Sequence, residues 1–532
     1  MRRRIAIGGV LATLVLLVSL SVFQTSSLPP VQADVPLRVA ISADIRGTNP
    51  GVTRDGNTDA VLHHVVEGLV AYRQNLEVAP MLAEHVEVSP DFRTYSFRLR
   101  EKLRFHNGAP VTSAEVKWSW ERMLDPATGM RCRSWYDGSA NTGFGAKIVR
   151  IETPDRLTAV FTLDKPNSVF LDQLASLQCI TAILHPASVD KNGNWIGPIG
   201  TGPFRIREWR RGEFVDLERF DGYNPRQEPS DGYAGARIAL APRVRFVIIP
   251  EAAVGVSAVR AGDIDILPRT PAYVTAHLDL KRDGMQTSES EQLAWHTLLI
   301  QTQNPLFRDV RIRRAIAMAL DPRQIAKIAT LSDIPANPSA IPLLSPFHTK
   351  HQDKWWPYDP SEARRLLSQA GYRGQPVLIQ TNRKTPFAFD NAVAIQAMLI
   401  SVGIDARLDV LDWATQLSNY QEGKFQLSAF SYSARAHPVL SYAMFSGSKE
   451  KHAAVQWDDQ VAQALLARST IVGSLSEQQR IFDALHNRMV TTVPIIGLYN
   501  EPSSDLLRAN IVGYRNWPIG YPRLWGVSRK GS

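Results

Sequence analysis

Residue types that often carry out chemistry are present, but none has the spacing of a metal or catalytic site. There is no His-Glu-x-x-His, no Cys-x-x-Cys, no acidic calcium loop and no Gly-x-Ser-x-Gly elbow. His63 and His64 are adjacent, and neighbouring helical residues point about 100° apart, so we interpret both as ordinary helix residues. The run Gly200-Thr201-Gly202-Pro203 lacks the lysine of a phosphate loop. We expect no catalytic residue, no metal and no cofactor.

Aromatic residues beside polar, turn-prone positions point instead to ligand binding. The chain has 12 Trp and 14 Tyr. Aromatic rings can stack on a ligand while their polar tips orient it. For any single ring, packing in a core is the simpler explanation. The set that fits a pocket is Trp135, Tyr136, Trp413, Tyr420, Tyr432 and Tyr442.

Strands and helices are expected to alternate, which predicts an α/β fold. Polar and apolar residues alternate over 94–100, which indicates a half-buried strand. Thr112 and Glu115 have the spacing of a capping box, and the helix that they start is stopped by Asp125-Pro126. Later elements are expected as a helix from Pro360 to Ala370, a strand at 376–380, a helix at about 390–402 and a strand at 404–411.

Length and charge exclude some classes of protein. A chain of 532 residues is too long for one core, so two or three domains are expected. The formal net charge is +9, and the arginines at positions 2–4 contribute three of these charges. Lysines and arginines are scattered among acidic residues, which gives no support to nucleic-acid binding and permits a mild preference for anionic ligands.

The first 33 residues have the order of a secretory signal peptide. The arginines at 2–4 precede an apolar run over 5–22, and Val31-Gln32-Ala33 is a small-x-small cleavage site. A transmembrane anchor is the alternative, because the apolar run is long enough. The polar stretch at 24–27 favours cleavage.

The number and positions of the two cysteines indicate the cellular compartment in which the protein is expected. No cysteine follows the cleavage site to carry a lipid, so we expect a periplasmic protein that is not a lipoprotein. An oxidising compartment permits a disulfide between Cys132 and Cys179, and two buried thiols are the alternative.

A series of motifs gives the chain a resemblance to a known family. It is similar to the solute-binding proteins of the oligopeptide, dipeptide and nickel class, which feed ABC importers, over nearly all of the chain after residue 33. The order and spacing of the motifs carry the resemblance. They are VEGLV at 66–70, APMLAE at 79–84, YSFRLR at 95–100, FHNGAPVT at 105–112, GTGPF at 200–204, AGDID at 261–265, FRDVRIRRA at 307–315 and the stretch 358–372.

The resemblance implies a two-lobed periplasmic binding protein with an additional inserted domain. The ligand cleft would lie between the lobes, which would close about a hinge. Residues 76–196 would form the inserted domain II, and residues 286–496 would form lobe 2, or domain III. Lobe 1, a discontinuous domain I, would consist of residues 34–75, 197–285 and 497–532.

The family's pocket carries over only in part. Peptide-binding members hold the ligand's amino group with an Asp that follows a strand of the second lobe. Arg435 stands at that place here, and a guanidinium favours carboxylate or phosphate. Our hypothesis is that the ligand carries an anionic group. The alternative is a structural ion pair of Arg435 that faces away from the cleft.

Other residues follow from the same resemblance. Arg383 lies close to the place of an Arg that meets the ligand carboxylate in some relatives, allowing a one-residue gap. Trp413 and Tyr432 match tryptophan positions of relatives' pockets, and the loop 44–49 faces the cleft in the family. The predicted ligand-binding residues are Asp44, Arg46, Asn49, Trp135, Tyr136, Arg383, Trp413, Tyr432, Ser433 and Arg435.

The expected function is capture of a short peptide or peptide-like molecule by a monomer and its delivery to an inner-membrane ABC permease and its ATPase. A non-peptide anion, such as an opine or a sugar-phosphate conjugate, is the alternative ligand. A chemoreceptor-coupled or chaperone role on the same scaffold is a second alternative. An exported hydrolase is a third, and it would need a nucleophile–base pair or a metal set.

Overall fold

The structure is a computed structural model that describes residues 35–139, 145–275, 278–385, 387–433 and 435–530. The expected signal peptide, residues 1–33, lies outside the described residues. Residues Pro36–Ser532 form one unit. None of the helices described is long and apolar enough to cross a membrane. Strands and helices alternate through this unit, which confirms the predicted α/β class.

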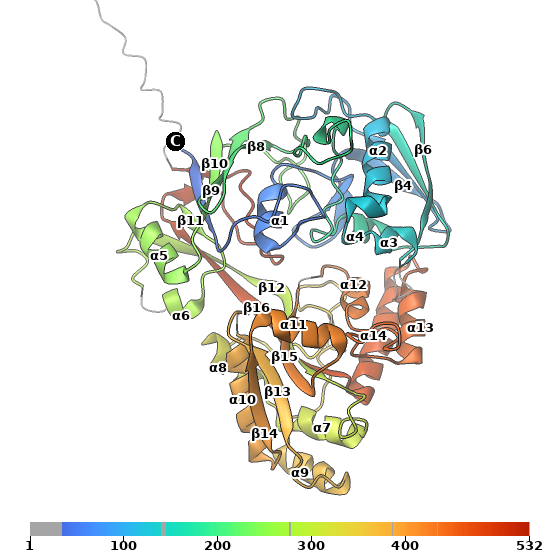
Figure 1. The fold of residues 1–532 in the computed structure, drawn as a ribbon, viewed down its shortest axis with the longest axis vertical. Coiled ribbons are helices and arrows are strands. Elements are labelled where there is room, and N and C mark those ends of the chain that lie inside the picture. Colours follow the sequence, from blue (N-terminus) through green and yellow to red (C-terminus); the bar gives the residue numbers. More distant parts are fainter. Residues whose placement is uncertain (1–34, 140–144, 276–277, 386, 434, 531–532) are drawn as a thin grey trace, which may run out of the picture. The chain divides into compact units, whose positions relative to one another are not determined.

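One mixed sheet of ten strands joins the two parts that we call lobe 1 and lobe 2 (Figure 1). Its strands are β1 (Leu37–Ile41), β8 (Phe204–Arg210), β9 (Phe214–Arg219), β10 (Arg243–Ile248), β11 (Ile266–Leu267), β12 (Met285–Ile300), β13 (Val377–Asn382), β14 (Ala406–Leu411), β15 (Leu427–Tyr432) and β16 (Ile495–Arg508). Their order is β14-β13-β15-β12-β16-β11-β1-β10-β9-β8. The long strands β12 and β16 pair antiparallel in the middle and belong to both lobes.

Lobe 1 is completed by both ends of the described chain. β1 is almost wholly buried and pairs in parallel with β10 and β11. At the other end, Arg529 Nη2 donates to the Pro36 carbonyl oxygen over 2.7 Å and to Asp265 Oδ2 over 2.6 Å. The short strands β17 (Ile511–Val512) and β18 (Ser528–Arg529) pair with each other. The first and last segments therefore share one core.

The helices of lobe 1 are α1 (Gly56–Leu62), α5 (Ala252–Ala261) and α6 (Ala272–Thr275). The interpretation of His63 and His64 as helix residues is wrong, because α1 ends at Leu62. After it, His64 N bonds Val61 O and Val65 N bonds Leu62 O, which is the tighter three-residue spacing. Both histidines are buried, and His64 Nε2 accepts from Leu524 N over 3.2 Å.

The inserted domain has a sheet of its own. Its strands β4 (Ala83–Val88), β5 (Thr94–Leu99), β6 (Ile148–Asp155) and β7 (Thr158–Leu163) have the order β4-β5-β7-β6. The predicted alternation in β5 and the capping box of α2 (Ser113–Leu124) are both confirmed. The remaining elements around it are β2 (Val70–Tyr72), β3 (Val78–Pro80), α3 (Ser134–Asp137), α4 (Phe170–Leu174) and the 3₁₀ turns Pro126–Thr128 and Pro186–Ser188.

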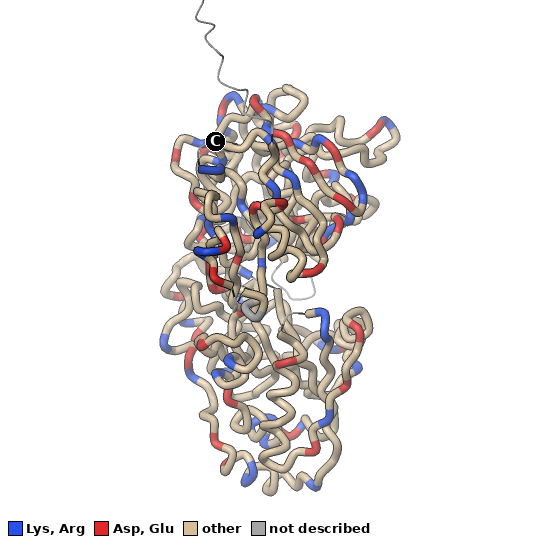
Figure 2. Tube along the Cα trace, turned by 90° about the vertical axis from the view of Figure 1, so that its left-hand side faces the viewer, with Lys and Arg blue, Asp and Glu red and all other residues tan. Residues whose placement is uncertain are grey.

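In lobe 2, three parallel strands lie among helices. These helices are α7 (Val310–Ala319), α8 (Pro322–Thr330), α9 (Pro360–Gln369), α10 (Ala388–Ser401), α11 (Trp413–Glu422), α12 (Pro438–Ala443), α13 (Gln460–Ser469) and α14 (Leu475–Thr492). The predicted elements between 360 and 411 are present with boundaries shifted by one or two residues. Acidic and basic residues are interspersed over both lobes (Figure 2). The domain boundaries given above remain a prediction, and the names lobe 1, inserted domain and lobe 2 refer to them.

Candidate ligand-binding site

Three neighbouring strands of lobe 2 bring predicted site residues to one edge of the large sheet. β13, β14 and β15 are parallel, so their carboxyl ends lie at the same edge. Arg383 follows β13, Trp413 comes shortly after β14, and Ser433 follows β15. β12 enters lobe 2 from lobe 1 at this edge, where its Trp295 pairs with Tyr432. The edge therefore faces lobe 1, and α/β sheets bind ligands beyond the carboxyl ends of their strands.

Arg435 lies in the loop after β15, at the sheet edge that faces lobe 1. Its Nη1 donates to Ser433 Oγ over 2.9 Å. The next residue, Ala436, packs into the apolar cluster built mainly from the inserted domain. Burial and the like charge of Arg54 lower the pKa of Arg435 to about 10, so it remains a cation at neutral pH.

Arg54 belongs to a charged group of lobe 1. It forms an ion pair with Asp59, and the Tyr521 hydroxyl donates to Asp59 Oδ2 over 3.1 Å. Asp55, which follows Arg54, caps α1 by accepting from Thr58 N over 2.8 Å. Burial raises the pKa of Asp59 to about 6, although Arg54 and Tyr521 oppose the shift. At the start of α1, Arg54 is thus held next to the fully buried carboxyl group of Asp59.

The strands that join the lobes carry a second charged group. The pairing of β12 with β16 loses its register between Glu291 and Trp295. Glu501 lies on β16 at this interruption, with Oε1 3.1 Å from Arg269 Nη2 and Oε2 3.4 Å from His296 Nε2. Burial would raise the pKa of Glu501, but Arg269 and His296 lower it to about 2. A carboxylate is therefore held where the connecting strands are irregular.

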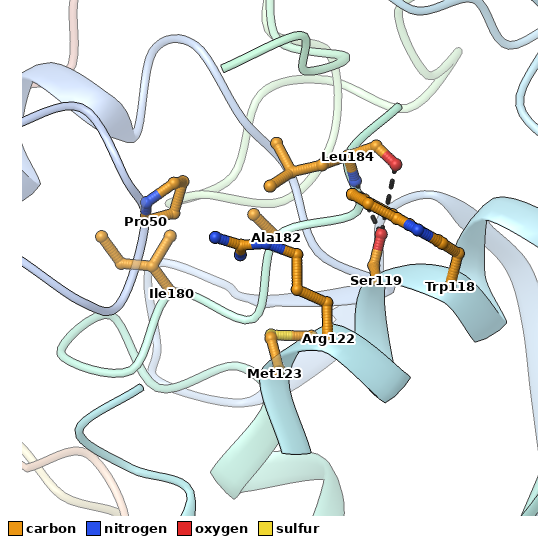
Figure 3. A pocket seen from close by; sticks show the side chains of 8 residues that line it. All are labelled: Pro50, Trp118, Ser119, Arg122, Met123, Ile180, Ala182 and Leu184. Carbon is orange, nitrogen blue, oxygen red and sulfur yellow. Dashed lines mark hydrogen bonds between the residues drawn. The ribbon is translucent and has the colours of Figure 1, made fainter. Parts of the chain in front are cut away.

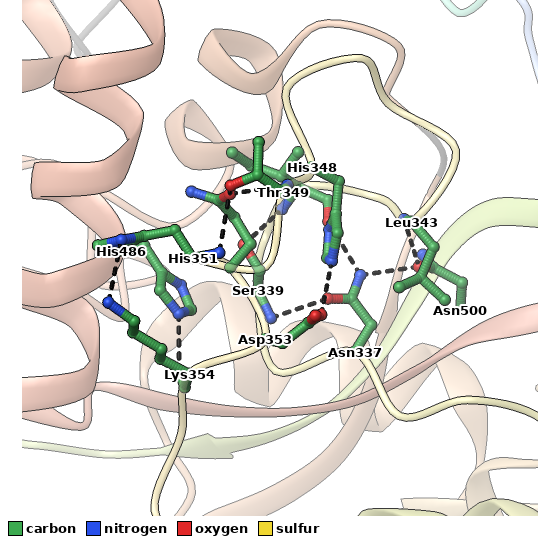
Figure 4. Close-up of polar contacts among 12 residues, drawn as sticks. Asn337, Ser339, Leu343, His348, Thr349, His351, Asp353, Lys354, His486 and Asn500 are labelled. Atoms are coloured by element: carbon green, nitrogen blue, oxygen red, sulfur yellow. Dashed lines mark hydrogen bonds and ion pairs between the residues drawn. The ribbon is translucent and has the colours of Figure 1, made fainter.

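Polar contacts also fix residues 337–354, a segment next to the irregular part of β16 (Figure 4). Asn337 Nδ2 donates to Asn500 Oδ1 over 2.8 Å, and His486 Nε2 lies 2.8 Å from the Lys354 carbonyl oxygen. These contacts hold residues 337–354 against β16 and α14. In the described part of the chain, no three His, Cys, Asp or Glu residues are grouped to hold a metal ion.

Aromatic side chains lie behind the edge formed by β13, β14 and β15. Tyr432 is buried, with its ring centroid 6.4 Å from that of Trp295. Its hydroxyl lies 3.5 Å from that of Tyr420. Trp413 is half-buried, and its ring centroid is 5.8 Å from that of Phe430. Tyr432 is thus a core residue, whereas Trp413 and Tyr420 keep surface that a ligand can reach.

Trp135 and Tyr136 are neighbours in α3 but lie in different surroundings. Tyr136 is fully buried in the inserted domain, and its hydroxyl donates to the Gln173 carbonyl oxygen over 2.8 Å. Trp135 is half-buried and packs against the apolar clusters of both the inserted domain and lobe 2. A disulfide joins Cys132 to Cys179, with Cα atoms 5.6 Å apart, and ties the start of this segment to the domain core.

The inserted domain also contacts lobe 2 through its backbone. Ser168 N donates to the Thr470 carbonyl oxygen over 2.7 Å, and Val169 packs in the apolar cluster of lobe 2. The Phe92 ring lies against Gly473, where a Cβ would be 2.3 Å from Phe92 Cζ. The two sides of the candidate site therefore touch in this structure.

The predicted loop 44–49 contacts lobe 1 and the inserted domain. Asp44 Oδ1 accepts from Trp209 Nε1 over 2.8 Å, and Asn49 Oδ1 accepts from Arg122 Nη2 over 3.2 Å. Arg46 is exposed. Arg122 also lines a small hollow (Figure 3), whose lining residues are Pro50, Trp118, Ser119, Arg122, Met123, Ile180, Ala182 and Leu184. None of these belongs to lobe 2, so the hollow is separate from the edge that carries Arg435.

Arg383 is exposed at the carboxyl end of β13. Its guanidinium carbon lies 3.6 Å from the centroid of the Phe389 ring at the start of α10. This cation–π contact holds the cation at the edge of lobe 2. Its role in ligand binding remains a prediction.

Sequence reasoning missed five charged or polar residues near the candidate site. Asp59 and Tyr521 are separated by 462 positions, and Arg269 and Glu501 by 232. Residues that are so far apart in the sequence form no local motif from which their contact could be predicted. The fifth residue is Arg54, whose position before a helix cap carried no distinguishing pattern.

Comparisons with known proteins agree with this architecture. A family model described as "Bacterial extracellular solute-binding proteins, family 5 Middle" matches residues 77–452. The chain is 25% identical over 496 residues to the dipeptide-binding protein DppE of Bacillus subtilis, covering 86% of each chain. It is 26% identical over 501 residues to the glutathione-binding protein GsiB of Escherichia coli K12, covering 90% of this chain and 91% of that one.

Solved structures show the same fold. The PBP AgaA from A. tumefaciens R10, in complex with agropinic acid, is 26% identical with a TM-score of 0.75, covering 94% of this chain and 99% of that one. NikA from Brucella suis, in complex with Fe(III)-EDTA, has a TM-score of 0.80 at 20% identity, covering 93% of this chain and 100% of that one. The predicted two-lobed binding-protein fold is thereby confirmed.

Proposed function

Because the chain belongs to family 5 of the bacterial extracellular solute-binding proteins, we propose that it is the solute-binding component of an ABC importer. It captures a short peptide or peptide-like molecule between its lobes and delivers it to an inner-membrane permease with its ATPase. The relatives named as dipeptide- and glutathione-binding proteins support this ligand class. The protein acts as a periplasmic monomer that a cleaved signal peptide exports without a lipid anchor.

The observation that carries the ligand proposal is the place of Arg435. It lies beyond the carboxyl end of β15, next to Ser433. A buried or half-buried guanidinium favours a carboxylate or phosphate partner through two parallel hydrogen bonds. The ligand therefore carries an anionic group that meets Arg435, with Trp413 and Arg383 at the same edge.

A non-peptide anion is the second candidate ligand. The relative AgaA, whose solved complex holds agropinic acid, is as similar to this chain as the glutathione-binding relative is. Arg435 suits the acidic group of either kind of molecule. Under this alternative the import function is the same and only the class of cargo changes.

The test begins with mass spectrometry of any molecule released from the purified, exported protein. A thermal-shift panel follows, with glutathione, free dipeptides, a sugar phosphate and agropinic acid. A true ligand raises the melting temperature in proportion to RT ln(1 + [L]/Kd). Tight binding of neutral free-amine peptides, with no response to the acidic compounds, would show that Arg435 does not select the ligand.

A further inference from the structure

The inserted domain contacts lobe 2 at a place outside the strands that join the lobes. On the lobe 2 side this place is the link between α13 and α14, residues 470–473. Ser168 N donates to the Thr470 carbonyl oxygen over 2.7 Å. Val169 is fully buried and packs in the apolar cluster of lobe 2. A backbone hydrogen bond and an apolar side chain thus dock the inserted domain on lobe 2.

An aromatic ring adds to this contact from a strained backbone position. Phe92 has a φ of +54°, in the left-handed region that bulky side chains rarely adopt. Its amide donates to the Ser89 carbonyl oxygen over 2.9 Å, which closes the turn before β5. Glycine takes such a φ without strain. The ring of Phe92 instead reaches Gly473 of lobe 2, which a glycine at position 92 could not do.

The surface of lobe 2 has room for this ring because Gly473 has no side chain. A Cβ on Gly473 would lie 2.3 Å from Phe92 Cζ, and the next nearest atoms, at 3.1 and 3.2 Å, belong to the same ring. The φ of Gly473 lies outside the left-handed region, so its backbone does not require glycine. Gln478 Nε2 donates to the Val472 carbonyl oxygen over 3.0 Å and fixes the link. A side chain at position 473 would therefore meet the Phe92 ring first.

The two contacts of the inserted domain belong to one connected edge. Asn167 N donates to the Phe92 carbonyl oxygen over 3.0 Å, which ties the segment 167–169 to the Phe92 turn. Asn167 is fully buried, and its Nδ2 donates to Gln173 Oε1 over 2.9 Å. The edge is thus anchored in the inserted domain, and its parts meet lobe 2 together.

We propose that this edge is a latch, in which Phe92, Ser168 and Val169 hold residues 470–473 and keep the lobes together in the ligand-free protein. The inference deepens the proposed function and rests on it, because closure matters when a ligand binds between the lobes. The latch contacts exist only while the lobes touch. They therefore supply part of the free energy of closure and raise the affinity for any ligand that binds the closed form.

Hydrogen exchange of the ligand-free, exported protein tests the latch. The reporter is the Ser168 amide, because its acceptor lies in lobe 2 and opening of the lobes exposes it to exchange. Phe92→Gly removes the ring and suits the positive φ, and we expect it to speed this exchange by about tenfold. Gly473→Ala puts a Cβ where the ring lies and should act in the same direction. Small-angle X-ray scattering should show a larger radius of gyration for both variants.

Matched variants separate the latch from general effects. Lys102→Gly makes the same kind of change at an exposed position with a φ of +60° and should leave Ser168 exchange unaltered. Gly197→Ala adds a Cβ that meets no atom within 4 Å and should also be silent. The double variant Phe92→Gly/Gly473→Ala should exchange no faster than Phe92→Gly, because the added Cβ then has no ring to displace. Circular dichroism and melting temperature show that each variant is folded.

Three results would overturn the latch. One is a wild-type Ser168 amide that exchanges as fast as an unprotected amide, which needs no variant to interpret. Another is unchanged exchange in both Phe92→Gly and Gly473→Ala, and the third is an additive effect in the double variant. Because none of these measurements uses a cargo molecule, their failure would leave the proposed import function standing. Failure of the protein to bind any compound of the thermal-shift panel would likewise leave the exchange result intact.

Discussion

Arg269 Nη2 lies 3.1 Å from Glu501 Oε1, and this ion pair connects lobe 1 to a strand that both lobes share. On the other side of the carboxylate, His296 of β12 lies 3.4 Å from Oε2. The Glu501 side chain is only 8% exposed, whereas that of Arg269 is 51% exposed. Arg269 and His296 therefore contact Glu501 from two sides, at the place where the pairing of β12 with β16 loses its register.

Replacement of Glu501 by Gln should destabilise the protein. The change removes the negative charge that Arg269 and His296 contact, and it leaves a buried ion pair incomplete. We expect the free energy of unfolding to fall by about 1–3 kcal/mol. This range allows for the partial exposure of Arg269, which weakens the ion pair. Urea unfolding measures the free energy of unfolding. Glu289→Gln, a change at an exposed residue of the paired strand β12, is the matched control and should have little effect. Equal stability of both variants would contradict a structural role for the ion pair.

Asp505 should make the stability depend on pH. It is buried, and burial raises its pKa to about 6, above the ordinary value of about 3.9. Between these two pH values the folded protein binds more protons than the unfolded chain, so stability falls as pH rises from about 4 to about 6. Asp505→Asn cannot ionise and can still accept from Arg269 N, which now bonds Oδ1 over 2.7 Å.

We therefore expect Asp505→Asn to be more stable than the wild type at pH 7 by up to about 3 kcal/mol and nearly equal to it at pH 4. Asp59 titrates in the same range, so the wild-type curve contains its contribution as well. The informative quantity is the difference between variant and wild type, measured by urea unfolding across this pH range. A difference that does not change with pH would show that Asp505 has an ordinary pKa.

Removal of the disulfide should lower the stability of the inserted domain. Cys132 and Cys179 are 47 positions apart, and a cross-link over such a loop is worth about 2–4 kcal/mol in the chain-entropy account. The double variant Cys132→Ala/Cys179→Ala should melt at a lower temperature than the wild type. A reducing agent should reproduce the loss in the wild type and leave the double variant unchanged. A reducing agent that lowers both melting temperatures equally would mean that the disulfide is not the cause.

Truncation of Arg435 should weaken binding of the native ligand. A charge-assisted hydrogen bond contributes about 1.5–3 kcal/mol, so Arg435→Ala should raise the Kd by about 10- to 100-fold. Isothermal titration calorimetry with the molecule identified by mass spectrometry measures this change. Arg407→Ala is the control, because Arg407 is exposed near the start of β14, at the opposite end from the binding edge, and pairs with Asp405. An unchanged Kd for Arg435→Ala would assign Arg435 to the structural alternative.

Local patterns predicted those parts of the fold that depend on near neighbours. The alternation of β5 and the capping box at Thr112 are contained within a few residues, so the sequence shows them directly. The end of α1 was missed because His64 takes its partner, Leu524 N, from a segment 460 positions away. The end of such a helix is decided by tertiary contacts, which local propensity does not include.

The site was predictable only where the family pattern marked a position. Arg435 is marked by the family pattern, because a different residue type stands there in peptide-binding relatives, and the structure places it just after β15. Tyr136 matched the description of a pocket aromatic but is fully buried in the inserted domain. The type of an aromatic residue and its neighbours in the sequence do not show whether its ring lies in a core or in a pocket. Arg54 and Glu501 became visible only through partners brought together by the fold.

The pairing of β1 also bears on how lobe 1 can fold. Strand β1 is synthesised early, yet its neighbours β10 and β11 come more than 200 residues later along the chain. The contact of Arg529 with Pro36 joins segments that are still further apart in sequence. The core of lobe 1 therefore depends on contacts of long sequence separation, which form slowly because a long loop must close first.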